Sequence, residues 1–177
     1  MPSGTLLFGA KGKAANPLWL RWLALSAAIV LADQFTKWLI LARFRFGERL
    51  PVIDGLFDLV LAFNRGAAFS FLSDASGWQR YAFVGLALSV SVALMLFLRR
   101  AGSTQLHLGL ALILGGAIGN VIDRIRMGEV VDFLLVYHGG WSWPAFNVAD
   151  SAITIGAGLL ILDSFRQRRV DTPASRE

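Results

Sequence analysis

Two aspartates of this sequence, Asp132 and Asp150, stand in apolar segments without a basic residue beside them. Burial raises the pKa of a carboxyl group, and two buried carboxyl groups that meet must share one proton. Such a pair suits peptide hydrolysis, because one carboxylate takes a proton from water while its protonated partner hydrogen-bonds the carbonyl oxygen under attack. A turn at Gly139-Gly140 lets the chain double back between them. The residues alone leave a pair of Asp123 and Asp150 open as well.

A second polar pair lies earlier in the chain. Asp33 and Lys37 are four residues apart with the acid first, which is the favourable order for an ion pair on one face of a helix. We expect this pair to hold the structure in shape. Asp123 beside Arg124 can be interpreted as a solvated pair that neutralises itself at a helix end.

The composition places these residues in a membrane protein. Hydrophobic residues make up 55% of the 177 residues and charged residues only 16%, which is too apolar for a soluble domain. The chain has no cysteine, which excludes disulfides, thiolate metal sites and cysteine nucleophiles. His107 and His138 lack partners at ligand spacing, so no metal site is expected. The net charge of +5 comes from bases at segment ends and indicates membrane lipids, not nucleic acid, as a partner.

Four segments are long and apolar enough to cross a membrane, for which a helix needs about 20 residues. The expected spans are residues 22–42, 81–98, 101–122 and 145–164. We expect one domain over residues 1–177, with cytoplasmic tails at 1–17 and 169–177 and an extracytoplasmic insert at 43–80. A cleavable signal at the N-terminus is disfavoured, because the apolar pattern continues without a small-residue cleavage site.

The insert has its own pattern. Apolar residues punctuated by Pro51 and Gly55 predict short strands around a turn, and the small residues from Gly66 to Leu72 suit a short helix or loop at the membrane surface. The predicted fold class is therefore a membrane all-α protein, a four-transmembrane-helix bundle with a small extracytoplasmic β-sheet and a short surface helix.

The bias of lysine and arginine places both termini in the cytoplasm by a small margin. Alternating spans then bring several polar side chains toward the outer interface, where polar groups inside spans usually mark a functional site. These residues are Asp33, Lys37, Asn120, Asp123, Arg124, Asn147 and Asp150.

Four ordered motifs give the sequence a specific resemblance. GNVIDRIRMGEVVDF followed by FNVADSAI, with LADQFTK and AFNRGAAFSFL upstream, closely resembles the lipoprotein signal peptidase family, also called signal peptidase II, over roughly residues 20–168. The resemblance implies an aspartyl endopeptidase of the bacterial inner membrane with four spans, a small outside sheet and an outside helix. It also implies cleavage of prolipoproteins just before a diacylglyceryl-modified cysteine.

Residue roles follow from the same resemblance. Asp132 and Asp150 match the catalytic pair, which resolves the choice against Asp123. The positions that match the substrate-binding site are Asn64, Gly66, Ala67, Ala68, Asn120, Arg124 and Asn147. The positions that match supporting polar residues are Asp33, Lys37 and Asp123. The resemblance implies no metal or organic cofactor, and it implies cyclic peptide inhibitors of the globomycin type as ligands.

Two rival functions use the same residues. A serine-lysine protease could pair Lys37 with Ser70 or Ser151, but Asp33 one turn away favours the protonated lysine, which cannot act as a base. A proton-coupled transporter could use intramembrane aspartates, yet such proteins usually have repeated halves with broken helices at the midplane, whereas these acids cluster at one interface.

Overall fold

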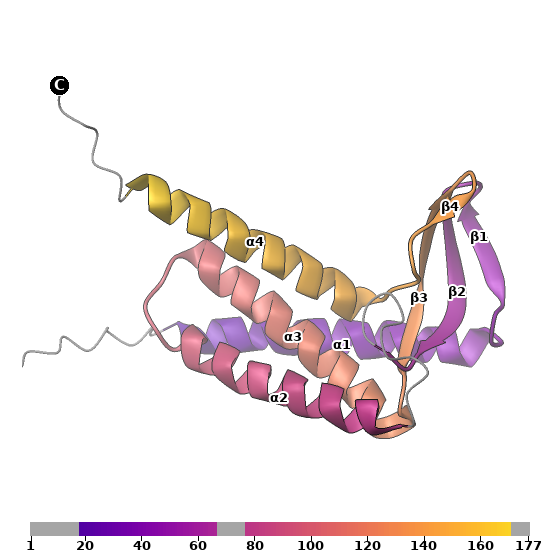
Figure 1. Cartoon of the computed structure of the whole chain (residues 1–177), viewed down its shortest axis with the longest axis horizontal. Coiled ribbons are helices and arrows are strands. Elements are labelled where there is room, and N and C mark those ends of the chain that lie inside the picture. The colour runs from indigo at the N-terminus through magenta and orange to yellow at the C-terminus, as the bar shows by residue number, and fades with distance from the viewer. Residues whose placement is uncertain (1–17, 67–76, 171–177) are drawn as a thin grey trace, which may run out of the picture.

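The computed structural model describes residues 18–66 and 77–170, with side chains up to Arg166. Its helices are α1 (Trp19–Arg43), α2 (Trp78–Leu98), α3 (Thr104–Met127) and α4 (Val148–Val170). All four are long and apolar enough to cross a membrane. The described residues thus form the predicted four-helix bundle, with a sheet standing across one end of it (Figure 1).

Helix α3 is the most buried of these helices and packs against the other three. Its glycines allow close approach, since a Cβ on Gly115 would lie 2.8 Å from the carbonyl oxygen of Ser26 on α1. A Cβ on Gly119 would lie 2.7 Å from a carboxylate oxygen of Asp33. The small-residue spacing of Gly115 and Gly119 therefore serves helix packing.

The described strands form one antiparallel sheet in the order β1-β2-β3-β4. Their bounds are β1 (Arg49–Ile53), β2 (Phe57–Asn64), β3 (Val130–His138) and β4 (Trp141–Ser142). The β1–β2 hairpin turns at Gly55, where φ is 76°, and confirms the strands predicted around that glycine. Strands β3 and β4 follow α3 and were not predicted, although the turn at Gly139-Gly140 joins them as expected.

Strand β3 begins directly after α3 because Gly128 ends the helix. Gly128 has φ 86°, a left-handed conformation that glycine adopts readily, and its N–H bonds the carbonyl of Arg124 at 3.1 Å. Val131 and Phe133 then pack into the core beside α1 and β2. Since side chains alternate along a strand, Asp132 lies on the opposite face of the sheet.

The helix bounds correct the expected spans by a few residues. Helix α1 ends at Arg43, and α2 begins three residues early, at Trp78. Helix α3 starts later, at Thr104, and continues past its apolar run to Met127, and α4 runs through Val170 into the expected tail. Helices end where a capping residue breaks the hydrogen-bond ladder, not where hydrophobicity stops. The predicted surface helix falls at residues 67–72, outside the described part of the chain.

Candidate active site

Asp150 lies in the first turn of α4, where Asn147 caps the helix. The Asp150 N–H donates to Asn147 Oδ1 at 2.9 Å, and the Asn147 N–H donates back to Asp150 Oδ2 at 3.3 Å. This reciprocal arrangement satisfies two backbone donors that a helix start leaves open. The local sequence NVAD thus builds the cap and orients the Asp150 carboxyl group with the same contacts.

The same asparagine reaches the second aspartate. Asn147 is fully buried, and its Nδ2 donates to Asp132 Oδ1 at 2.7 Å. Asp132 is 3% exposed and also accepts a hydrogen bond from Asn64, which comes from the neighbouring strand β2. Asn147 therefore joins the two aspartates of the predicted catalytic pair, one from the sheet and one from the bundle.

Asn120 on α3 supplies the other contact to Asp150. Its Nδ2 donates to Asp150 Oδ1 at 2.8 Å. Its Oδ1 accepts hydrogen bonds from Lys37 Nζ at 3.1 Å and from Asn147 Nδ2 at 3.3 Å. The two asparagines thus connect both aspartates to one another and to a buried lysine.

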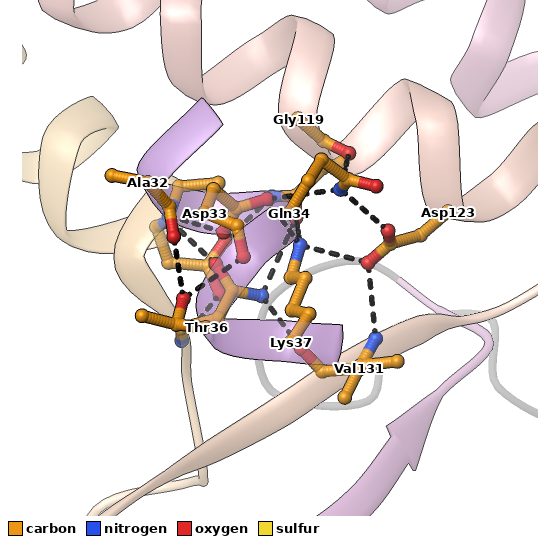
Figure 2. A network of polar contacts seen from close by, with 12 residues as sticks. Ala32, Asp33, Gln34, Thr36, Lys37, Gly119, Asp123 and Val131 are labelled. Carbon is orange, nitrogen blue, oxygen red and sulfur yellow. Dashed lines mark hydrogen bonds and ion pairs between the residues drawn. The ribbon is translucent and has the colours of Figure 1, made fainter. Parts of the chain in front are cut away.

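Lys37 lies between two carboxylates (Figure 2). Its Nζ is 2.8 Å from Asp33 Oδ2 and 2.7 Å from Asp123 Oδ2, and all three side chains are at most 3% exposed. The ion pair of Asp33 with Lys37 was expected, but Asp123 contacts this lysine and is not a solvated partner of Arg124. With Asn120 as its third acceptor, the ammonium group has used all its donors.

The carboxylates of this cluster also hold neighbouring backbone. Asp33 Oδ1 accepts from the N–H of Ala149 at the start of α4, at 2.9 Å. Asp123 Oδ2 accepts from the N–H of Val131 in β3, at 3.2 Å. Each acid is therefore anchored next to one aspartate of the predicted catalytic pair.

Gln34 is a polar residue of the site that sequence reasoning missed. Its Nε2 donates to Asp123 Oδ1 at 2.8 Å and to the Gly119 carbonyl at 3.2 Å, and it also contacts Asp33 (Figure 2). Gln34 therefore links α1 to α3. Its place directly after Asp33 was the available signal, since a glutamine within a predicted span needs a partner.

Arg124 brings together three residues from the predicted substrate-binding set. Its Nη2 donates to the Gly66 carbonyl at 2.8 Å, and the Gly66 N–H donates to Asn64 Oδ1 at 3.0 Å. The guanidinium carbon lies 5.3 Å from the ring centroid of Phe83 on α2. Within the described residues, the buried Arg124 Nε has no hydrogen-bond partner. Ala67 and Ala68 lie outside the described residues.

The surroundings of Asp132 keep its carboxyl group protonated up to about neutral pH. Burial is the main cause, and the nearby negative charge of Asp150 adds to it, so that the pKa of Asp132 rises from 3.8 to about 7. Hydrogen bonds from Asn64 and Asn147 and the charge of Lys37 act in the opposite direction. A carboxyl group with this pKa can give and take a proton near neutral pH, as acid–base catalysis requires.

The ion cluster leads to a prediction about stability. We expect Asp33→Asn and Lys37→Met each to lower the unfolding free energy in detergent, by about 3–5 kcal/mol, because each removes a partner of a buried charge. Lys37→Met should lower the unfolding free energy more than Asp33→Asn, since Asp123 then loses its counter-ion too. The double variant recovers part of the loss.

Thermal melting of the purified variants measures this effect. Trp38→Phe is the matched control on the same helix, because the Trp38 side chain is 61% exposed toward the surroundings of the bundle. Unchanged melting in both single variants would contradict a supporting role for the pair.

Comparisons with known proteins identify related sequences. A family model described as signal peptidase (SPase) II matches residues 25–166. A lipoprotein signal peptidase of Burkholderia vietnamiensis is 51% identical over 158 residues, which are 89% of this chain and 95% of that protein. One from Cupriavidus taiwanensis is 52% identical over 151 residues, 85% of each chain.

Solved structures give the same result. One described as a bacterial membrane enzyme matches with a TM-score of 0.80 at 27% identity, covering 94% of this chain and 99% of that one. A second with the same description matches with a TM-score of 0.72 at 30% identity, covering 85% and 94% of the two chains.

Proposed function

Since this chain belongs to the signal peptidase II family, we propose that Asp132 and Asp150 are the aspartates with which it hydrolyses its substrate. The enzyme is an aspartic-type lipoprotein signal peptidase, which removes the signal peptide of prolipoproteins immediately before the diacylglyceryl-modified cysteine. The observation that supports the pair is the double contact of Asn147, whose side chain touches the carboxyl group of one aspartate and caps the helix turn that carries the other.

The proposed reaction starts with a pair that carries one proton. The ionised carboxylate takes a proton from water, and the oxygen of that water attacks the carbonyl carbon of the scissile peptide bond. The protonated carboxyl group meanwhile hydrogen-bonds the carbonyl oxygen as negative charge develops there. The carbon–nitrogen bond then breaks as the leaving amine takes a proton from the pair, which returns the two aspartates to their starting state.

The residues around Arg124 are proposed to receive the substrate. Asn64 and Gly66 lie beside Arg124 at the junction of sheet and bundle, and the unpaired Nε of Arg124 offers a buried donor to a substrate carbonyl. Ala67 and Ala68 belong to the same proposal by their place next to Gly66 in the sequence. The side chains of Asn120 and Asn147 complete the proposed set.

The proposed location is the bacterial inner membrane, with both termini cytoplasmic and the active site near the periplasmic face. The sheet and the start of α4 lie at the same end of the bundle, and this end carries the two aspartates (Figure 1). We propose that the whole chain acts as one peptidase domain, and that globomycin-type cyclic peptides bind at the same site. Because the chain has no cysteine, labelling of single introduced cysteines from either side of the membrane tests the orientation.

The cleavage assay tests the function directly. Purified protein in a lipid bilayer, incubated with a diacylglyceryl-modified prolipoprotein, should release the signal peptide. A serine-lysine protease is a poor alternative, because Lys37 donates to three acceptors and cannot also serve as a base. Serine-directed acylating inhibitors should therefore leave cleavage untouched. Solute flux across reconstituted vesicles without any proteolysis would instead favour a proton-coupled transporter.

The pKa of Asp132 predicts how stability depends on pH. Because this pKa is raised from 3.8 to about 7, the folded protein keeps a proton that the unfolded chain loses. The stabilising contribution is complete below pH 4 and is lost as the pH rises through 7; it amounts to about 4 kcal/mol. Melting in detergent across this pH range should show the loss in the native protein and not in Asp132→Asn. The same dependence of melting on pH in both proteins would contradict the raised pKa of Asp132.

A further inference from the structure

The orientation of the Asn120 amide depends on Lys37. An amide group has an acceptor end and a donor end, and a cation binds only the acceptor. Lys37 Nζ contacts Asn120 Oδ1 at 3.1 Å, which turns the Nδ2 end toward Asp150 Oδ1, 2.8 Å away. A buried lysine outside the proposed pair, together with the amide nitrogen of Asn147, thus favours the orientation in which Asp150 receives a hydrogen-bond donor.

The charges that face Asp150 come from three elements. Helix α1 provides the cation of Lys37 and the carboxylate of Asp33, and β3 provides the other member of the pair, Asp132. Helix α3 provides Arg124, and Asp123 on the same helix contacts Lys37. A nearby cation and a hydrogen-bond donor favour the ionised form of a carboxyl group, whereas a nearby anion disfavours it. Lys37 and Asp33 therefore act on Asp150 with opposite sign.

The two aspartates differ in the contacts that favour a negative charge on the carboxyl group. Asp150 accepts from the lysine-oriented amide and from the backbone N–H of Asn147 at a helix start, where the helix dipole also favours negative charge. Asp132 lies in a strand, which has no comparable dipole, and its carboxyl group is more deeply buried. These hydrogen bonds thus favour a negative charge on Asp150 over one on Asp132.

We propose that Lys37 is a positioning residue that acts through Asn120 to keep Asp150 ionised as the base of the pair, while Asp132 holds the shared proton. This inference rests on the proposed function, and it extends the role of Lys37 beyond support of the fold. The two roles differ in what they predict. If the ion cluster only supported the fold, loss of Lys37 and loss of Asp33 would affect activity in the same way at every pH.

The pH profile of kcat/KM distinguishes the two roles of Lys37, with a diacylglyceryl-modified prolipoprotein in a bilayer as substrate. The acidic limb of the profile reports protonation of the base. Lys37→Met should move this limb to higher pH by about one unit, because the base loses a nearby cation. Asp33→Asn should move it to lower pH, although both variants lose stability. Shifts in the same direction, or no shift in either variant, would overturn the proposal.

A second variant keeps the test decisive if Lys37→Met does not fold. Asn120→Leu leaves the ion pairs of Lys37 with Asp33 and Asp123 in place, and it removes the amide group that joins Lys37 and Asn147 to Asp150. Asn120→Leu should move the acidic limb to higher pH. Adding Lys37→Met should move it little further, since both changes break the same link from Lys37 to Asp150. Full additivity of the two shifts would overturn the proposal. Failure of the native protein to cleave the precursor would instead refute the proposed function itself.

Discussion

Asp132→Asn and Asp150→Asn should each abolish cleavage of a lipidated precursor and leave the protein folded in the membrane. Asparagine has nearly the shape of aspartate and keeps an acceptor oxygen, but it cannot take a proton from water or give one to the leaving amine. General acid–base catalysis contributes on the order of 10²–10⁴ in rate, and loss of either member stops the proton exchange of the pair. Rates of signal-peptide release from native and variant proteins in the same bilayer measure the effect.

Asp58→Asn is the matched control for this experiment. Asp58 is a buried carboxylate in the same sheet, but it accepts from the hydroxyl of Tyr137 at 2.8 Å and pairs with Arg49, away from the two aspartates. Its replacement should leave the cleavage rate near that of the native protein. Near-normal turnover in Asp132→Asn or Asp150→Asn would make the assignment of the pair wrong, and Asp123→Asn would become the next test.

Removal of the lipid from the substrate should cause the second large effect. The proposed pair lies at the end of the bundle where the sheet stands (Figure 1). We expect an acylated cysteine to reach it sideways from the bilayer. Each buried methylene group contributes about 0.8 kcal/mol, and two acyl chains therefore provide ample free energy to place a scissile bond. Since this free energy also orients the bond in the transition state, kcat/KM should fall by orders of magnitude.

The comparison uses one precursor with and without its diacylglyceryl group, in the same bilayer, with release of the signal peptide as the readout. A rise in KM alone, with kcat unchanged, would mean that the lipid only concentrates the substrate at the membrane. Equal efficiency on both precursors would contradict entry from the bilayer. The two aspartates would then serve a more general membrane protease.

Local patterns of the sequence determined much of this protein. Long apolar runs can satisfy their backbone inside a membrane only as helices, so the number of spans followed from their length. The spacing of Asp33 and Lys37 places them on one helix face, and the pair forms at 2.8 Å. Gly55 and the Gly139-Gly140 dipeptide marked the two hairpin turns, because left-handed backbone conformations favour glycine. Each of these features depends on residues close together in the chain.

Tertiary structure decided the rest, because the remaining contacts join residues far apart in sequence. Pairing of β3 with β2 brings Asp132 beside Ala62, 70 positions earlier, which no local periodicity indicates. Asp123 pairs with Lys37 on another helix and not with its neighbour Arg124, since only the close approach of α3 to α1 at Gly119 brings the lysine within reach. The link through Asn147 likewise needs the strand and the helix start to be packed together. A buried carboxyl or amide group takes whichever partner the packing supplies, and the sequence lists the candidates without their distances.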